Sequence, residues 1–196
     1  MKIVDTRPCY DRVLNETENF LVVPTLGSIV PGYVMIISRM HIYSMAQTSD
    51  KEMEELLNLI EHTRLMFTAK FILPTIAFEH GSANGCFDMA ANSVDHAHIH
   101  ILPVDLSMES EIIKDAKAVQ IPAFHETRTY RNNPYLLFIN DHSICYISHG
   151  TVLPRQYMRR LIAKETGHPD EWDWKQYAFE NNVKETIDAL YSQITL

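Results

Sequence analysis

The sequence lacks the segments that direct a chain into or across a membrane. Its longest apolar runs, such as Tyr33–Ile37, fall far short of the roughly 20 residues that a membrane-spanning helix needs. The opening segment MKIVDTRPCYDR has no apolar core and no cleavage-site pattern, so no signal peptide is expected. These absences predict a cytoplasmic protein that does not associate with membranes.

Cysteine is also scarce. Cys9, Cys86 and Cys145 are odd in number and form no CxxC pair. This pattern is typical of a reducing compartment and argues against a disulfide framework or a cysteine zinc site. We expect no cofactor.

Positive charge is in deficit, since the formal net charge is −8. Binding to a nucleic-acid backbone depends on many Lys and Arg contacts, so no nucleic-acid partner is expected. A small anionic ligand is still compatible, because local donors hold it. With 46% apolar and 21% charged residues, the chain has the composition of a globular protein.

The first half reads as strands around one long helix. Ser49 and Glu52 have the spacing of a capping box, and apolar residues at helical spacing follow it, which predicts a helix over Asp50–Ala69. Apolar runs bounded by Gly and Pro predict strands. The expected strands are Asn19–Val23, Tyr33–Ser38, Thr75–Gly81 and Ser93–Pro103.

The second half has a different character but no flexible linker before it. Two strands are expected near YLLFIN and ICYISHG, and helices at Glu109–Val119, Asn182–Leu190 and from Pro154 to Gly167. We therefore divide the chain into a core, residues 1–104, and a C-terminal extension, residues 105–196, which packs on the core and is not an independent domain.

The segment DHAHIHILP, Asp95–Pro103, is the most unusual in the sequence. On a strand, alternate side chains share a face. His96, His98 and His100 would then lie on one face, and the intervening apolar residues would face the core.

Three interpretations of these histidines differ in chemistry. They could be surface residues, although strict alternation on an apolar strand is hard to obtain by chance. They could bind a metal ion, with His80 or Asp95 as the fourth ligand. They could also supply a nucleophile that attacks phosphorus, because imidazole is largely unprotonated at neutral pH.

The segment His96–Leu102 matches the His-φ-His-φ-His-φ-φ signature of the histidine triad (HIT) superfamily at every position. The longer segment ANSVDHAHIHILP resembles that family's GQ(S/T)V.H.H.H segment, VPGYVMIISRMH resembles its PGH strand and turn, and FEHGSA resembles its strand before NNGPA. The resemblance covers Cys9–Pro103.

The resemblance implies an α+β, HIT-like fold, with a five-stranded antiparallel sheet and a long helix, to which this chain adds a helical C-terminal extension. It also implies a homodimer. The implied activity is hydrolysis or transfer of a nucleotide phosphoanhydride or phosphoramidate through a covalent nucleotidyl-histidine, with a dinucleoside polyphosphate as one candidate substrate.

The resemblance also assigns roles to individual residues. His98 is the implied nucleophile, His100 is placed to donate to a phosphate or leaving oxygen, and His96 orients its neighbour. Asn92 falls where many relatives have a glutamine that touches the leaving oxygen, and Ser93 falls on a hydroxyl position. Backbone N–H groups near these two residues could bind developing negative charge.

Three departures from the family pattern fall on residues expected to bind substrate. Tyr33 stands where much of the family has histidine, and a tyrosine does not carry positive charge. Thr25 stands at the position of the ribose-binding Asp or Asn. His80 lies in an altered phosphate-facing rim, within Glu79–Gly81.

The basic segment PRQYMRR has two interpretations. It is a solvated helix face, or Arg155 and Arg159, four residues apart, share a face and bind one phosphate. Trp172 and Trp174 either stack on a base or pack in the fold. His41 is expected to be a rim residue.

Two other functions stay open beside the hydrolase or transferase. The departures at Tyr33 and Thr25 suit a nucleotide-binding protein with vestigial catalysis. The alternating histidines also suit a metal-dependent hydrolase, which a chelator would inactivate.

Overall fold

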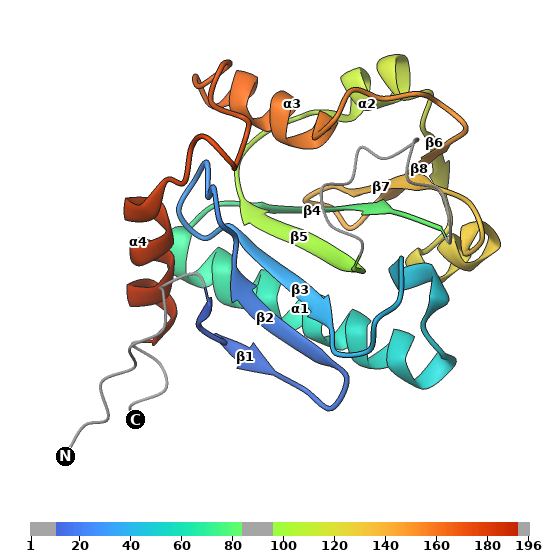
Figure 1. Cartoon of the computed structure of the whole chain (residues 1–196), viewed down its shortest axis with the longest axis horizontal. Coiled ribbons are helices and arrows are strands. Elements are labelled where there is room, and N and C mark those ends of the chain that lie inside the picture. The colour runs from blue at the N-terminus through green and yellow to red at the C-terminus, as the bar shows by residue number, and fades with distance from the viewer. Residues whose placement is uncertain (1–10, 84–95, 192–196) are drawn as a thin grey trace.

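The computed structural model describes residues 11–83 and 96–191, and its centre is one antiparallel sheet. The strand order is β1-β2-β3-β5-β4-β7-β8-β6 (Figure 1). The strands are β1 (Asn15–Glu16), β2 (Phe20–Pro24), β3 (Val34–Ser38), β4 (Thr75–Gly81), β5 (His98–Pro103), β6 (Val119–Ile121), β7 (Tyr135–Ile139) and β8 (Cys145–His149). The histidine strand β5 therefore lies in the interior of the sheet.

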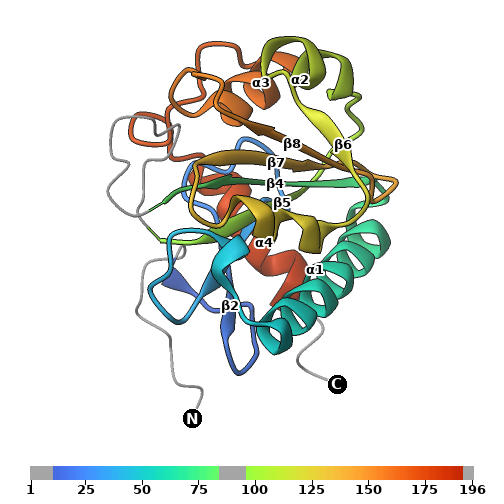
Figure 2. The same ribbon diagram turned by 90° about the vertical axis from the view of Figure 1, so that its right-hand side faces the viewer.

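Helices cover both faces of this sheet. The helices are α1 (Asp50–Phe71), α2 (Glu109–Asp115), α3 (Tyr157–Glu165) and α4 (Glu180–Tyr191), with short 3-10 segments η2 (Met45–Gln47) and η3 (Phe124–Tyr130). Figure 2 shows α2 and α3 on the side of the sheet away from α1. None of the helices in the described part of the chain is long and apolar enough to cross a membrane.

The α+β class is confirmed, but the sheet is larger than expected. Strands β1 to β5 make the five antiparallel strands of the predicted core. The extension then adds three strands, because β7 pairs with the free edge of β4, β8 pairs with β7, and β6 pairs with β8. An unpaired β4 edge would expose its N–H and C=O groups, and β7 satisfies them. That residues 105–196 do not fold alone stays a prediction.

Helix α1 has the predicted start. The side chain of Ser49 accepts from the Glu52 N–H, and the Glu52 carboxylate accepts from the Ser49 N–H, so both halves of the capping box are formed. The buried side of α1, which includes Leu56 and Phe67, packs in one core cluster with Ile99 of β5. This face of the sheet is closed by apolar packing.

The opposite face of the sheet is covered only in part. Residues of α3 such as Met158 and Ile162 pack in a second cluster with Ile76, Phe78 and Leu102 of the sheet. This cluster also takes in Tyr33, which immediately precedes β3. The extension thus covers the β4 side of this face, and the side of β2 and β3 is more open.

Candidate functional site

His98 and His100 lie side by side on the more open face of the sheet, which we call the histidine face. Their ring centres are 4.8 Å apart and the rings meet edge to face. The intervening Ile99 is fully buried in the α1 core, as the alternation predicted. The strand is therefore apolar on one side and carries imidazoles on the other.

One contact determines the tautomer of His98. Its Nδ1 lies 2.7 Å from the carbonyl oxygen of His96, and a carbonyl can only accept. Nδ1 therefore carries the ring proton, and Nε2 has a free lone pair. Burial lowers the pKa of His98, although the hydrogen bond to His96 acts in the opposite direction, so the ring is neutral at pH 7. A neutral imidazole with a free Nε2 is the form that attacks phosphorus.

His96 does not belong to the strand, which begins at His98 rather than at Ser93. The Nε2 atom of His96 lies 2.6 Å from the Ser38 carbonyl oxygen, and its ring meets that of the exposed His41 at 5.2 Å. The prediction that the strand includes His96 is thus wrong, and the orienting role expected of His96 stays a prediction. A bend there places its backbone carbonyl against Nδ1 of His98.

His100 is enclosed by aromatic rings. It stacks on Phe78 at 4.4 Å and meets Tyr33 edge to face at 5.4 Å, while His80 meets Phe78 edge to face at 5.9 Å. Burial lowers the pKa of His80 to about 3 and that of His100 well below its usual range. Both rings are neutral hydrogen-bonding groups, and neither His100 Nδ1 nor His80 Nε2 has a partner among the described residues.

Tyr33 and Thr25 are brought to the same face. The Thr25 N–H donates to the Tyr33 carbonyl at 3.0 Å, which continues the pairing of Pro24 with Val34, so the two side chains stand opposite each other. Both are buried, and both hydroxyls lack a partner among the described residues. Burial raises the pKa of Tyr33 to about 12, so this residue carries no charge.

Asn92 and Ser93, the expected donors near the phosphate, lie outside the described residues, as does Asp95. Their roles stay predictions. Within the described part of the chain, no three His, Cys, Asp or Glu side chains are grouped to hold a metal ion.

The predicted pairing of Arg155 with Arg159 is wrong. Helix α3 begins at Tyr157, and Gln156 before it has a left-handed backbone with φ 57°, which takes Arg155 out of the helix. Arg155 is exposed, whereas Arg159 is buried against the histidine face, with its Cζ 5.7 Å from the centre of the Tyr33 ring. Trp172 is stacked under Arg160 at 3.3 Å.

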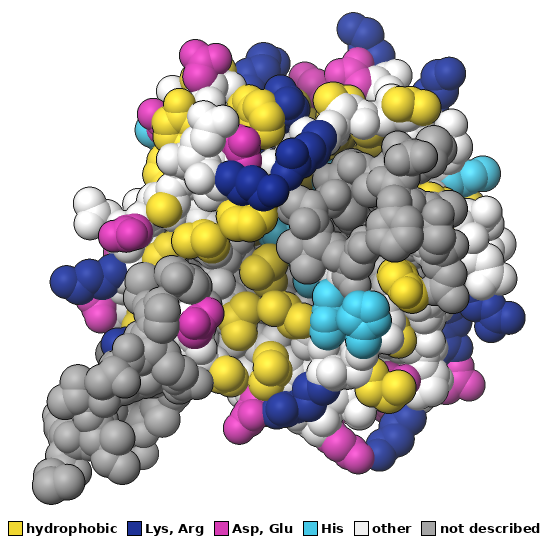
Figure 3. All heavy atoms as spheres, in the orientation of Figure 1, with side chains coloured by type: hydrophobic (Ala, Val, Ile, Leu, Met, Phe, Trp, Pro, Cys, Tyr) yellow, Lys and Arg dark blue, Asp and Glu magenta, His cyan; other side chains and the backbone are white. Residues whose placement is uncertain are grey.

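An apolar surface next to the histidines was not anticipated. Leu21, Val23, Met35 and Ile37 are half-buried, and the pairing of β2 with β3 and of β3 with β5 places them on the histidine face. Figure 3 shows hydrophobic side chains over β2 and β3, with histidines at their edge. The signal in the sequence was that FLVV and VMII are apolar at every position, which indicates that both faces of these strands contact apolar groups.

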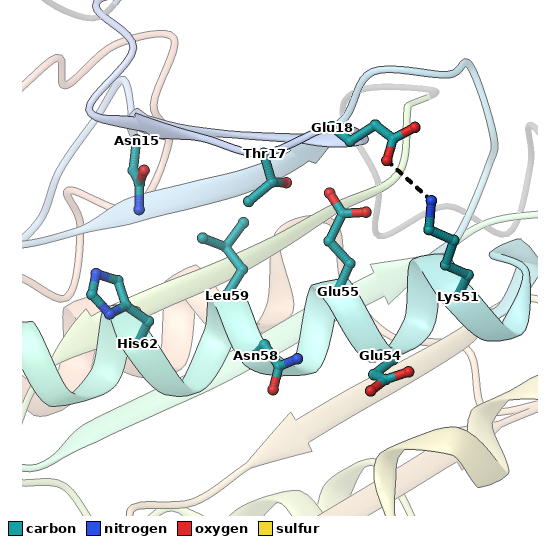
Figure 4. A pocket seen from close by; sticks show the side chains of 9 residues that line it. All are labelled: Asn15, Thr17, Glu18, Lys51, Glu54, Glu55, Asn58, Leu59 and His62. Carbon is teal, nitrogen blue, oxygen red and sulfur yellow. Dashed lines mark hydrogen bonds and ion pairs between the residues drawn. The ribbon is translucent and has the colours of Figure 1, made fainter.

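A separate pocket lies between β1 and α1 (Figure 4). An ion pair of 3.1 Å joins Glu18 to Lys51 at one end, and the Glu55 carboxylate accepts from the backbone and side chain of Asn19. Glu18, Lys51 and Glu55 are therefore already partnered, and the pocket lies apart from the histidine face.

Several solved structures are similar to parts of this chain. A hypothetical histidine triad nucleotide-binding protein from Sulfolobus tokodaii is 17% identical with a TM-score of 0.40, over 48% of this chain and 61% of that one. The NitFhit protein of C. elegans is 20% identical with a TM-score of 0.43, over 48% of this chain and 22% of that one. This chain thus spans less than two thirds of either protein.

A third structure aligns with most of the chain. A Hit-like protein involved in cell-cycle regulation from Bartonella henselae is 11% identical with a TM-score of 0.43, over 90% of this chain and 85% of that one. Similarity at this level does not transfer a ligand or an activity to this chain.

Sequence comparisons complete the assignment. No curated protein matches the chain. The family model of the HIT domain matches residues 7–106, just over half of the 196 residues, and this range contains the histidine strand and its neighbours in the sheet. The chain therefore belongs to the HIT domain family.

Proposed function

We propose that this protein is a nucleotide hydrolase or transferase that forms a covalent nucleotidyl-histidine on His98. Membership of the HIT domain family supports a role in binding, hydrolysing or transferring nucleotides. The observation that carries the finer proposal is the hydrogen bond from His98 Nδ1 to the His96 carbonyl, which leaves Nε2 free to attack.

In the first step the Nε2 lone pair attacks the α-phosphorus of the substrate. A P–N bond forms, and the bond from phosphorus to the bridging oxygen, or to the nitrogen of a phosphoramidate, breaks with its electron pair on the leaving group. The ring becomes positively charged, and the His96 carbonyl stabilises it through the Nδ1 proton. This role of a backbone oxygen requires no carboxylate beside His98.

In the second step an acceptor restores the enzyme. Water attacks the phosphorus, the P–N bond breaks, and its electron pair returns to Nε2 while the proton of water passes to solvent. Phosphate or another nucleophile in place of water would make the reaction a transfer. The ring of His100 lies 4.8 Å from that of His98. His100 can therefore donate to a phosphate oxygen when its ring proton is on the nitrogen nearer to that phosphate.

The half-buried apolar residues of β2 and β3 support a nucleoside next to this phosphate position. A base is flat and largely apolar on its faces, so contact with side chains such as Val23 and Met35 would remove apolar surface from water. Thr25, which stands on the same face, has a hydroxyl without a partner in the described part of the chain, and this hydroxyl suits a sugar hydroxyl.

The test is to trap the adduct. Wild type and the variants His98→Ala and His142→Ala would be incubated with dinucleoside polyphosphates and nucleoside phosphoramidates. Intact-mass spectrometry at neutral pH would follow the adduct, and chromatography would follow product. His142 is the matched control because it is an exposed histidine on the turn after β7.

We expect a nucleotidyl adduct and turnover in wild type and in His142→Ala. In His98→Ala we expect no adduct and a loss of turnover of about 10³-fold or more. Turnover by His98→Ala at the wild-type rate would refute the mechanism. Tight nucleotide binding without adduct or turnover in wild type would favour the binding-only alternative.

A further inference from the structure

Arg159 is a buried cation supplied by the extension. Only 5% of its surface is exposed. Its Nε donates to the Trp172 carbonyl at 2.9 Å, and its Nη2 donates to the Gly27 carbonyl at 2.6 Å. The third nitrogen, Nη1, is buried and has no partner among the described residues. One edge of the guanidinium therefore holds the fold, and the remaining nitrogen has unused donor capacity.

The charge of Arg159 also has no counter-charge among the residues that the structure describes. No described carboxylate lies within ion-pair distance of it, and its two hydrogen-bond partners are neutral carbonyls. The Tyr33 ring, 5.7 Å from Cζ, contributes a cation–π attraction. Burying an ion away from water costs free energy, which hydrogen bonds and a counter-charge offset. Arg159 has two such hydrogen bonds and the Tyr33 ring, fewer contacts than its charge and donors allow.

The unpartnered atoms around Arg159 belong to one place on the histidine face. Tyr33 lies under the guanidinium, and His100 meets Tyr33 edge to face at 5.4 Å. Burial lowers the pKa of His100, and the charge of Arg159 acts in the same direction, as expected for near neighbours. The Tyr33 hydroxyl, the His100 Nδ1 and the Arg159 Nη1 are all buried, and none of them makes a hydrogen bond of standard length and angle with a described residue. The Arg159 guanidinium nevertheless lies close enough to the Tyr33 hydroxyl to oppose the effect of burial on the pKa of Tyr33.

We propose that Arg159, together with Tyr33 and His100, binds a phosphate-like anionic group of the ligand. The extension would then complete the site. That this anion belongs to a nucleotide held at His98 rests on the proposed function. The arrangement supplies from α3 the positive charge that Tyr33 cannot carry. A guanidinium suits this task, because it keeps its charge when buried and offers donors in a fixed plane.

Gly27 supports the same arrangement. Its backbone has φ +75°, and a Cβ added there would lie 2.8 Å from Arg159 Nη2. The glycine therefore lets the turn before Tyr33 approach the guanidinium closely. The turn fixes the plane of Arg159 and leaves Nη1 on the remaining side.

The test measures anion binding without relying on catalysis. Calorimetric titration with inorganic pyrophosphate would compare wild type, Arg159→Gln and Arg155→Gln. Arg155 is the matched control, because it is exposed just before α3 and its replacement removes the same charge. We expect Arg159→Gln to weaken pyrophosphate binding about tenfold or more, and Arg155→Gln to change it by less than about twofold.

The inference is overturned if wild type does not bind pyrophosphate, or if Arg159→Gln binds it as well as Arg155→Gln does. If Arg159→Gln does not fold, Arg159→Lys and Tyr33→Phe replace it. Arg159→Lys keeps the charge without the planar fork, and Tyr33→Phe removes only an unpartnered hydroxyl. Wild-type affinity in both of these variants would equally overturn the inference.

Binding measurements with adenosine and adenosine monophosphate, made beside the pyrophosphate titration, separate this inference from the proposed function. Pyrophosphate binding that depends on Arg159, without a His98 adduct or binding of the monophosphate, would sink the proposed function and leave the anion site in place. An adduct that forms in Arg159→Gln with unchanged kcat and KM, together with unchanged pyrophosphate binding, would sink the anion site alone.

Discussion

Two buried arginines, Arg64 and Arg159, lie on opposite sides of the sheet and use their donors differently. All three nitrogens of Arg64 on α1 are bonded. Nε donates to the Thr75 hydroxyl at 3.0 Å, Nη1 to the Ser143 hydroxyl at 2.8 Å, and Nη2 to carbonyls that include Asn140 at 2.9 Å. In Arg159 the Nη1 atom has no described partner. Every nitrogen of Arg64 therefore binds a group of the fold, whereas one nitrogen of Arg159 has no such described bond.

The carboxyl group of Glu79 extends the comparison. On the α1 side of β4, its two oxygens accept from the Met45 N–H at 2.7 Å and from the Tyr135 hydroxyl at 2.6 Å. On the histidine side of the same sheet, the Tyr33 hydroxyl has no described partner. Other buried polar atoms, such as the Ser44 and Thr127 hydroxyls, also lack a described partner. What sets the histidine face apart is that Tyr33, His100 and Arg159 lie in contact with one another there, and this grouping indicates a ligand.

The largest expected effect is on stability when Arg64 is replaced. Arg64→Met would leave the Thr75 and Asn140 carbonyls without their donor in a buried place, and we expect a loss of about 4 kcal/mol in the free energy of unfolding. Arg159→Met removes fewer bonds together with an uncompensated charge, so we expect about half that loss. Urea denaturation measures both. A larger loss for Arg159→Met than for Arg64→Met would contradict the expected order.

The second expected effect is a pH dependence that comes from Glu79. Burial raises the pKa of Glu79 to about 7 from its usual 4.5, so the folded protein binds the proton more tightly than the unfolded chain does. The stabilisation is complete below pH 4.5 and is lost as the pH rises through about 7. Between about pH 5 and about pH 8, we expect the free energy of unfolding of wild type to fall by about 2 kcal/mol relative to that of Glu79→Gln.

The difference in the free energy of unfolding between wild type and Glu79→Gln isolates the contribution of Glu79, because the contributions of the other titrating groups cancel. His80 alone would act in the opposite direction, since its pKa is lowered to about 3 and its contribution is lost as the pH falls below 6.5. Denaturant unfolding at several pH values is the measurement. A constant difference across this range would show that the Glu79 carboxyl titrates normally.

The smallest expected effect separates two buried tyrosines. Tyr135→Phe removes a hydroxyl that donates to Glu79 and accepts from the Ala46 N–H, and we expect a loss of about 1–2 kcal/mol. Tyr33→Phe removes a hydroxyl with no described partner, and we expect a change of less than about 0.5 kcal/mol. Thermal and urea denaturation of both variants give the comparison. Equal losses would mean that the Tyr33 hydroxyl is bonded within the fold.

Much of the core could be predicted because its signals are local. The capping box at Ser49 and Glu52 and the apolar spacing behind it depend on residues within one or two helical turns, and α1 begins where they predict. The alternation after His98 likewise assigns Ile99 and Ile101 to the α1 core and Leu102 to the opposite face, because the side-chain period of a strand is independent of the rest of the chain.

The position of Arg159 could not be predicted for the opposite reason. Four-residue spacing placed it with Arg155, but the left-handed backbone at Gln156 separates them, and no local pattern showed that break. Its contacts with Gly27 and Tyr33 join residues more than 100 positions apart. Such contacts depend on how α3 packs on the sheet.

Short, regular spacing of residue types was enough to predict the strand that carries His98 and His100, the capped helix and the family. Packing between distant segments set the departure of His96 from the strand, the continuation of the sheet through β7 and the position of Arg159 over Tyr33. Pairing and burial of this kind depend on the whole packed arrangement, which local propensity does not encode.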